Sequence, residues 1–570
     1  MRIETASKAG RFAIFRQLLA EGITCMFGNP GSSEQNLLDA LRANEFKTFQ
    51  YYLALHEGPA VAMADSYARS TRKPAVVQLH SYAGLANGLG MIYYARRGHT
   101  PLVVLVGEAG LRYEALDGQM AADLVTMARP FVKADDNGPC AWRVVDRGSV
   151  LRLLRRAIKA AATAPMGPVL LVLPMDVLDE DNAETIVPSV RIRTEATPDA
   201  QTIEEAARLL AQAERPLIIV GDGISASNAQ PDLVRVAELL GAVVWGANSS
   251  EVNMPSSHPL SGGDLGHMFG EDSLPITSRA DAVLVSGTSV LPEVFPALEG
   301  VFAPGASVLH FDLNTYEVAK NFPIAIGALA DPKSTLSALG KALERVMTAE
   351  QHAKSKSRSE CERQRKQSIR DNEIARDQRV LDVEPLRMAR FARDLAARLP
   401  EGTVIFDEAL TNSPDLRRYV AQDVPGTYFQ TRAGMLGTGL PGALGLKLAH
   451  PDKMVFGFSG DGGSISTIQA LATAARHDIG AKFVVCNNRN YRILKYNLRQ
   501  YWSHLGESTE QSFPVEFDLH SPILRFDQMA EAQGVQAIRV ARVVDIAPAL
   551  DRALENDRPF LIDLVLSADL

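Results

Sequence analysis

Short runs of apolar, β-branched residues recur along the whole chain, and they constrain its fold more than any other feature. Each run is continuous rather than alternating, which is typical of strands buried on both faces of a parallel sheet. Amphipathic segments such as 202–214 separate the runs. The clearest runs are 75–79, 102–106, 168–173, 217–220, 282–285, 307–311, 403–406, 454–456, 482–485 and 560–564. This alternation of strands and helices predicts an α/β chain with doubly wound parallel sheets.

Two stretches interrupt the alternation and divide the chain. Residues 178–199 are polar and acidic and contain Pro188 and Pro198, so we interpret them as a linker. Residues 347–382 are densely charged but lack glycine and proline, which favours a solvated helix over a coil. The 570 residues, at roughly 150 per domain, allow three or four domains. We predict three α/β domains, at 1–180, 195–345 and 380–570.

Composition argues against several classes of function. With 59 Lys and Arg against 67 Asp and Glu, the chain has a net charge of −8, which disfavours a nucleic-acid-binding role. The four cysteines lie far apart in the sequence, which favours neither a disulfide framework nor a zinc site. No apolar run reaches about 18 residues, and the first seven residues contain no apolar core. We therefore expect no membrane span and no signal peptide, and a soluble protein of the cytoplasm.

The strongest sign of chemistry lies in the third predicted domain, where an apolar run ends in a glycine-rich turn at 460–464. A helix is predicted over 465–477, and the next apolar run ends in Asn487 and Asn488. Glycines in such a turn let backbone N–H groups approach an anion, and a helix N-terminus adds about half a positive charge. A carboxylate and an amide oxygen, combined with phosphate oxygens, suit Mg²⁺. The residues therefore predict a metal-bridged diphosphate site with Asp461 and Asn488 as ligands.

Gly460-Asp461-Gly462, followed after about 25 residues by Asn487-Asn488, resembles the cofactor motif of thiamin-diphosphate-dependent enzymes. The resemblance implies that Asp461, Asn488 and the backbone carbonyl of Asn490 hold Mg²⁺. The cofactor-binding residues it implies in this region are Gly460, Asp461, Gly462, Gly463, Ser464, Asn488 and Tyr491. The alternative is a chance glycine turn with a structural aspartate, and the correctly spaced asparagine pair makes that alternative the weaker one.

The first domain resembles the same family in its activating-glutamate segment. Residues 52–58 predict a strand that ends in Glu57, followed by a helix over 59–69. In the family this carboxylate lies against the aminopyrimidine ring of thiamin diphosphate and activates it. Taken alone, Glu57 would more simply be a solvated glutamate at a strand end.

Two further segments of the first domain, 27–34 and 79–88, resemble turns of benzoylformate decarboxylases. By this resemblance Ser32 contacts the substrate carboxylate and His80 relays protons. Taken alone, Ser32 would be a helix N-cap and His80 a structural histidine.

The segment 431–442 allows two interpretations. Its glycines at 437, 439 and 442 spell the GxGxxG fingerprint of dinucleotide-binding proteins, but no clean β-branched run directly precedes them. In thiamin-diphosphate enzymes this region cradles the pyrimidine. By that resemblance the carbonyl of Gly434 accepts a hydrogen bond from the amino group of the cofactor, and Leu436 supports its bent form. For Leu436 the alternative is an ordinary core leucine.

The resemblance covers nearly the whole chain, in the order pyrimidine-binding, middle and diphosphate-binding domain, with two departures. The middle-domain stretch 289–295 lacks the second active-site histidine of benzoylformate decarboxylases. Residues 488–494 look more like the acetolactate-synthase-like branch. No decisive nucleotide fingerprint occurs in 195–345, so binding of FAD or another nucleotide there stays open. The identity of the 2-oxo acid also stays open.

The resemblance implies a thiamin-diphosphate- and Mg²⁺-dependent lyase that decarboxylates a 2-oxo acid of the benzoylformate type to an aldehyde and CO₂. The alternatives are a carboligase or aldehyde lyase with the same cofactor, a nicotinamide oxidoreductase, and a catalytically silent paralogue. In the family the cofactor lies between the first domain of one chain and the third domain of another. A homodimer or homotetramer is therefore implied, with no nucleic-acid or membrane partner.

Overall fold

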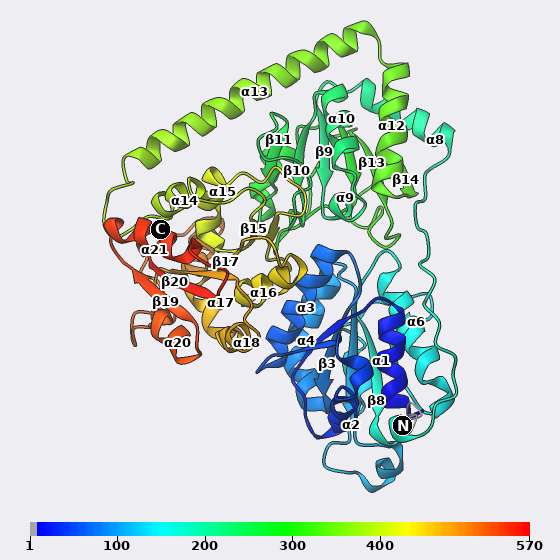
Figure 1. The fold of residues 1–570 in the computed structure, drawn as a ribbon. Helices are drawn as coiled ribbons and strands as arrows, with labels where there is room; N and C mark the ends of the chain where they lie inside the picture. The colour runs from blue at the N-terminus through cyan, green and yellow to red at the C-terminus, as the bar shows by residue number, and fades with distance from the viewer. Residues whose placement is uncertain (1–7) are drawn as a thin grey trace.

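The computed structural model describes residues 8–570, which form three α/β lobes joined by long connections (Figure 1). Residues 1–7, on which the expectation about a signal peptide rests, lie outside the described residues. Each lobe contains a six-stranded sheet whose neighbouring strands are all parallel. This arrangement confirms the predicted fold class of three doubly wound parallel-sheet domains. Among the residues from 8 onward, no helix has the length and apolar character needed to cross a bilayer.

The first lobe has a sheet with a separate hydrophobic core on each face. Its strands, in spatial order, are β2 (Gln50–Leu53), β1 (Cys25–Gly28), β3 (Ala75–His80), β4 (Leu102–Glu108), β8 (Val169–Pro174) and β7 (Ala141–Arg143). Its helices are α1 (Gly10–Ala20), α2 (Gln35–Ala40), α3 (Glu57–Thr71), α4 (Ser81–Arg97), α5 (Leu124–Ala128), α6 (Val150–Ala162) and α7 (Met175–Asp179). In β3, Val77 belongs to one core and Val76 to the other, which explains why the run is apolar throughout.

The third lobe repeats the strand order of the first. Its strands, in spatial order, are β16 (Tyr428–Gln430), β15 (Val404–Glu408), β17 (Val455–Gly460), β18 (Lys482–Asn487), β20 (Phe560–Val565) and β19 (Gln536–Val540). Its helices are α14 (Met388–Ala396), α15 (Ser413–Tyr419), α16 (Gly439–Ala449), α17 (Asp461–Ser466), α18 (Ala470–Arg476), α19 (Arg492–His504), α20 (Phe526–Ala532) and α21 (Val543–Leu554). In both sheets the first strand lies between the second and the third. Open α/β sheets bind ligands at the carboxyl ends of strands where the order reverses in this way.

The middle lobe has a different strand order, the one typical of dinucleotide-binding folds. Its strands, in spatial order, are β11 (Ser261–Asp264), β10 (Val243–Gly246), β9 (Pro216–Val220), β12 (Ala282–Ser286), β13 (Ser307–Asp312) and β14 (Ile326–Leu329). Its helices are α8 (Ala200–Ala211), α9 (Gly223–Ala226), α10 (Gln230–Leu240), α11 (Leu274–Thr277) and α12 (Pro332–Val346).

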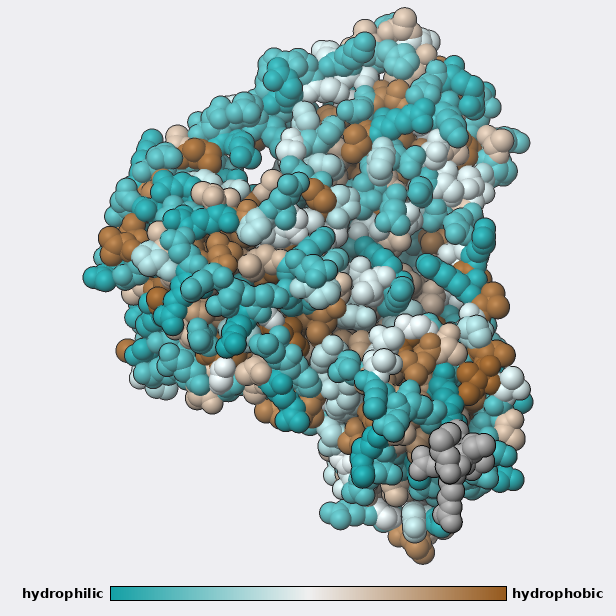
Figure 2. All heavy atoms as spheres, in the orientation of Figure 1, coloured by the Kyte–Doolittle hydropathy of each residue, from teal (hydrophilic) through white to brown (hydrophobic). Residues whose placement is uncertain are grey.

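Two connections link the lobes, and both agree with the interruptions predicted from the sequence. Residues 182–199 contain no helix or strand. Helix α13 (Ala349–Gln378) is a 30-residue helix that arches over the outside of the molecule, and its side of the surface is largely hydrophilic (Figures 1 and 2). Lys366 anchors it by donating to the backbone carbonyls of Ser256, His258 and Ser261.

Helix α3 of the first lobe packs directly on α16 of the third, and one hydrophobic core runs through both lobes. Met63 and Leu444, one from each helix, are fully buried in this core. A Cβ at Gly445 of α16 would lie only 2.1 Å from the carbonyl oxygen of Met63. Glycine at this position therefore lets the two helix backbones approach closely.

A buried cluster of charges ties all three lobes together around α3. Arg69 of α3 and Arg72, the residue directly after this helix, both pair with Glu251 of the middle lobe. Arg432 of the third lobe donates to Asp65 of α3 at 3.0 Å. Burial alone would raise the pKa of Glu251, but the nearby Arg72 and Arg69 outweigh it and lower this pKa to about 2. The Glu251 carboxylate is therefore ionised, buried and dependent on its partners.

We predict that Glu251→Gln destabilises the fold at pH 7 by about 3 kcal/mol, because it removes a counter-charge from buried Arg69 and half-buried Arg72. The pKa of Glu251 is about 2 in the folded chain against an ordinary value of 4.5, so its stabilisation is complete above pH 4.5 and is lost as the pH falls toward 2. Thermal unfolding of wild type and variant at several pH values measures both effects.

The gap in melting temperature should be widest near pH 7 and should narrow below pH 4.5. Glu344→Gln is the control, since Glu344 pairs with Arg235 at an exposed position and such pairs contribute little. Equal melting temperatures for Glu251→Gln and wild type at pH 7 would refute the structural role of the cluster.

Candidate active site

The first half of the candidate site lies at the carboxyl end of the first sheet, where Glu57 is the first residue of α3. The prediction that a strand ends in Glu57 is wrong, because β2 stops at Leu53. His56 has extended backbone and caps α3 by accepting a hydrogen bond from the N–H of Gly58 at 3.0 Å. Pro59 in the first turn has no N–H to leave unsatisfied, which favours this early helix start.

Two asparagines hold the buried carboxylate of Glu57. The Nδ2 of Asn29 donates to Oε1 at 3.1 Å, and the Nδ2 of Asn87 donates to Oε2 at 3.0 Å. Both asparagines lie in the segments that resemble benzoylformate decarboxylases, but the sequence analysis assigned neither of them a role. One amide donor comes from the loop after β1 and the other from α4, and together they fix the carboxylate in one orientation.

His80 is the last residue of β3 and lies close to Glu57. A Cβ at Gly84 would lie 3.3 Å from Oε1 of Glu57 and 3.4 Å from Cβ of His80, so this glycine separates the two side chains. The Nδ1 of His80 lies 3.0 Å from Oε2 of Glu34 and 2.9 Å from Oγ of Ser33. Ser33 and Glu34 have no role predicted from the sequence, although both lie in the segment 27–34 that resembles benzoylformate decarboxylases.

Ser32 lies at the start of the short 3₁₀ turn Ser32–Glu34, next to these residues, and is exposed. The N-cap position of this turn belongs to Gly31. The alternative interpretation of Ser32 as the N-cap is therefore wrong. The predicted residues Ser32, Glu57 and His80 come from three segments that the first sheet brings to one edge.

The second half of the candidate site lies at the carboxyl ends of β17 and β18, which are neighbours in the third sheet. Asp461 follows β17 directly and is buried. Its Oδ1 accepts from the N–H of Gly462 at 2.8 Å, and its Oδ2 accepts from the N–H of Arg489 at 2.6 Å. Burial raises the pKa of Asp461 to about 6 despite these hydrogen bonds. A bound cation would offset this cost of burying the charge.

The predicted helix over 465–477 is wrong in its length. The structure has two short helices instead, because Thr467 adopts a non-helical backbone with φ −133° between α17 and α18. With only six residues in α17, a helix dipole contributes less than expected. Among the described residues, the hydroxyl of Ser464 is buried in α17 without a hydrogen-bond partner. A phosphate oxygen would satisfy such a donor.

The loop after β18 brings the remaining predicted residues together. Asn488 and Asn490 are both buried, and the Oδ1 of Asn488 accepts from the N–H of Asn490 at 3.0 Å. The ring of Tyr491 covers Gly462, where a Cβ would lie 2.3 Å from the ring carbon Cε1. The turn 460–464 and this loop therefore form one contiguous unit.

These residues suit a magnesium diphosphate. Within residues 8–570 no group of three or more His, Cys, Asp or Glu is placed to hold a metal. Asp461, with the amide of Asn488 and the carbonyl of Asn490, offers a small set of oxygen donors. Mg²⁺ accepts such a set when phosphate and water oxygens complete its octahedron. The donor chemistry therefore fits Mg²⁺ together with a diphosphate and does not suit zinc.

The segment 431–442 reveals a buried carboxylate that sequence reasoning missed. Glu408, the last residue of β15, accepts from the N–H groups of Gly437, Thr438 and Gly439 and from the hydroxyl of Ser459. Burial raises the pKa of Glu408 to about 7. The N–H groups that a dinucleotide phosphate would use are thus occupied by the chain itself, which argues against the nicotinamide interpretation.

The two residues predicted to contact the pyrimidine both lie in the loop before α16. Gly434 has a φ of +68°, and a Cβ there would meet nothing within 4 Å. Leu436 is 37% exposed, so it is not an ordinary core leucine. The hydrogen bonds of Glu408 fix the end of this loop.

The middle lobe offers no room for a diphosphate at the point where its strand order reverses. The turns after β9 and β12 touch there, with the N–H of Gly223 donating to the carbonyl of Gly287 at 3.0 Å. A Cβ at Gly223 would lie 2.5 Å from the Cα of Gly287. The backbone itself fills the crevice that a dinucleotide would occupy.

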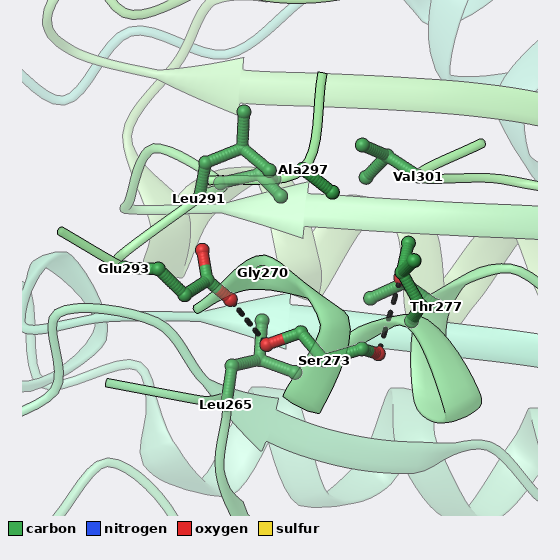
Figure 3. A pocket seen from close by; sticks show the side chains of 10 residues that line it. Leu265, Gly270, Ser273, Thr277, Leu291, Glu293, Ala297 and Val301 are labelled. Atoms are coloured by element: carbon green, nitrogen blue, oxygen red, sulfur yellow. Dashed lines mark hydrogen bonds between the residues drawn. The ribbon is translucent and has the colours of Figure 1, made fainter. Parts of the chain in front are cut away.

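The stretch 289–295, which lacks the histidine of benzoylformate decarboxylases, lines a small cavity in the middle lobe. Figure 3 shows Glu293 pointing at Ser273, whose hydroxyl donates to it. The cavity measures about 10 Å³, enough for about one water molecule. Phe295 of this stretch stacks on Phe269, which also stacks on His504 of α19. An aromatic stack thus joins this stretch to the helix that follows the predicted metal ligands.

Comparison with known proteins agrees with this geometry on all three lobes. Models of the thiamine pyrophosphate enzyme family match the N-terminal TPP binding domain at residues 8–127, the central domain at 203–339 and the C-terminal TPP binding domain at 411–564. The chain is 29% identical over 561 residues to benzoylformate decarboxylase of Pseudomonas aeruginosa, covering 97% of this chain and 98% of that protein. It is 27% identical over 578 residues to a probable acetolactate synthase large subunit of Methanocaldococcus jannaschii, covering 98% and 92%.

Among solved structures, the thiamine diphosphate-dependent 4-hydroxybenzoylformate decarboxylase of Rhodococcus jostii RHA1 superposes with a TM-score of 0.82 at 26% identity. The match covers 98% of this chain and 99% of that one. Family models on every lobe, full-length relatives and a full-length structural match lead to one conclusion: the chain belongs to the family of thiamine-pyrophosphate-dependent enzymes.

Proposed function

We propose that the chain is a Mg²⁺-dependent decarboxylase that uses thiamin diphosphate to convert an apolar 2-oxo acid of the benzoylformate type into an aldehyde and CO₂. The observation that carries this proposal is the buried carboxylate of Glu57, held by Asn29 and Asn87 and separated from His80 by Gly84. A fixed carboxylate beside a histidine supplies the proton-transfer groups that such a reaction needs.

The residues of the third lobe would hold the cofactor. Asp461, Asn488 and the carbonyl of Asn490 would bind Mg²⁺, and the turn 460–464 with Ser464 and Tyr491 would bind the diphosphate. Gly434 and Leu436 would contact the pyrimidine end. When bound, thiamin diphosphate supplies a carbon nucleophile and an electron sink for cleavage of the bond to the carboxylate.

The residues of the first lobe would handle the protons and the substrate. Glu57 would hold a proton on its carboxylate against the pyrimidine ring. Ser32, exposed at the tip of its turn, would orient the substrate carboxylate. His80, 19% exposed in its side chain, would exchange a proton with the reacting carbonyl group. Because the family places its cofactor between chains, we further propose a homodimer or homotetramer of this protein as the active form.

Carboligation with the same cofactor is the second candidate. Two observations favour it: the 27% identity to a probable acetolactate synthase, and the absence of histidine from 289–295. In that case a second carbonyl compound, rather than a proton, would capture the product carbon.

The products distinguish these two functions. With thiamin diphosphate, Mg²⁺ and a series of 2-oxo acids (benzoylformate, pyruvate and branched acids), we expect aldehyde and CO₂ in equal amounts. Chromatography of the carbonyl products alongside measurement of CO₂ tests this. A ketol as the main product would favour carboligation over simple decarboxylation. If none of these acids released CO₂, both candidate functions would be contradicted.

We predict that Glu57→Gln lowers kcat by about 10²-fold or more, because the amide cannot exchange the proton that the carboxylate carries. The variant should fold and retain thiamin diphosphate, since the amide has nearly the same shape. Glu45→Gln, at the surface of the same lobe where Glu45 pairs with Arg16, is the matched control. Turnover of Glu57→Gln at the wild-type rate would sink the proposed role of this carboxylate.

A further inference from the structure

In the first lobe, the candidate site contains another buried carboxylate beside Glu57. This is Glu34, to which the proposed mechanism gives no role. Its side chain is fully buried, and it lies beneath the histidine of the site. A Cβ at Gly107 would lie 1.8 Å from its Oε1, so a glycine on β4 makes the space for it. A buried charge is costly unless it is paired or hydrogen-bonded. The groups that contact Glu34 therefore indicate its role.

Three donors surround the Glu34 carboxylate. Its Oε2 accepts from the N–H of Gly31 at 2.8 Å, and its Oε1 accepts from the hydroxyl of Ser33 at 2.6 Å. Its Oε2 also lies 3.0 Å from the Nδ1 of His80. Within residues 8–570 no lysine or arginine forms an ion pair with this carboxylate, so the imidazole is the group that can bring a positive charge to it.

These contacts fix where the proton of the imidazole resides. An ionised carboxylate only accepts hydrogen bonds, so the Nδ1 of His80 must be the nitrogen that carries hydrogen. The Oγ of Ser33, 2.9 Å from the same Nδ1, already gives its hydrogen to Glu34 and can only accept from the ring. Both partners therefore occupy Nδ1, and Nε2 is left as the nitrogen available to a ligand.

The same geometry excludes a hydrolytic triad. In such a triad the serine and the carboxylate bind opposite nitrogens of the histidine, so that the ring can take the proton of the serine. Here Ser33 and Glu34 share one nitrogen. Ser33 is therefore a partner that orients the carboxylate and not a nucleophile.

The ring of His80 is also held sterically. A Cβ at Gly31 would lie 2.2 Å from its Cγ, and a Cβ at Gly84 would lie 3.4 Å from its Cβ. The glycine at position 31 therefore leaves the space that the ring occupies, while the hydrogen bond to Glu34 fixes the rotation of the ring. An imidazole held in this way has one orientation and one tautomer.

We propose that Glu34 is a positioning residue that keeps the proton of neutral His80 on Nδ1, so that Nε2 is the atom that exchanges protons with the substrate. This inference rests on the proposed function for the exchange step, but the tautomer of His80 can be measured without any reaction. An ionised Glu34 also stabilises the imidazolium that forms when Nε2 takes up a proton.

The test is ¹⁵N NMR of histidine-labelled protein, in which the shifts of the two ring nitrogens report the tautomer. The sequence has 11 histidines, and a His80→Gln sample identifies the signals of His80. We expect hydrogen on Nδ1 in neutral His80 of the wild type. Hydrogen on Nε2 in the wild type would overturn the proposal, whether or not any variant folds.

In Glu34→Leu no acceptor faces Nδ1, and the hydroxyl of Ser33 is free to donate its hydrogen there, so we expect the ring proton to move to Nε2. With the wrong nitrogen protonated, kcat should fall by about 10²-fold or more while KM changes by less than about threefold. The melting temperature and the thiamin diphosphate content are measured on the same samples. A Glu34→Leu protein that keeps hydrogen on Nδ1, or that keeps the wild-type kcat, contradicts the proposal.

Failure of the proposed function and failure of the positioning role of Glu34 give different results. If the wild type turns over no 2-oxo acid but its His80 carries hydrogen on Nδ1 and loses it there in Glu34→Leu, the proposed function fails and the positioning role stands. If the wild type is active and the tautomer does not respond to Glu34, the positioning role fails alone.

Discussion

The packing of α3 against α16 is the contact on which the rest of this structure depends. Both helices begin at the candidate site, with Glu57 opening α3 and the glycine turn over Glu408 opening α16. Their close approach, made possible at Gly445, fixes the first and third lobes relative to each other. The ion pairs of Arg69 then attach the middle lobe to the same helix.

The first and third lobes position their candidate site residues with the same sheet topology. Each places its candidate site residues at the carboxyl ends of strands at or beside the point where the strand order reverses. In the first lobe, loops there hold carboxylates with neutral donors and a histidine. In the third lobe, backbone N–H groups hold Glu408 and Asp461. The carboxylates of Glu57, Glu408 and Asp461 accept hydrogen bonds from neutral amide and hydroxyl groups, whereas Lys495 donates to the side chain of Asn490.

Much of the fold could be predicted from the sequence because its signals are local. Continuous apolar runs indicate buried parallel strands, and the spaced turn 460–464 and Asn488 indicate two neighbouring strand ends. The predicted helix starts at residue 59, two residues later than α3. The extended backbone of the capping residue His56 and the proline at 59 together resemble a strand end followed by a helix start. No glycine or proline in the sequence predicts the break between α17 and α18 at Thr467. The positions of Glu34 and Glu408 depend on partners distant in the sequence, which no local pattern reveals.

The central claim is that Glu57 and Asp461, on separate lobes, serve one thiamin diphosphate. A crystal structure of the protein grown with thiamin diphosphate and Mg²⁺ tests it most directly. The account predicts Mg²⁺ at about 2.1 Å from oxygens of Asp461, Asn488 and the carbonyl of Asn490. It also predicts the pyrimidine ring within hydrogen-bond distance of Glu57, from the same chain or a partner copy. A cofactor bound with its pyrimidine away from every copy of Glu57 would contradict the account.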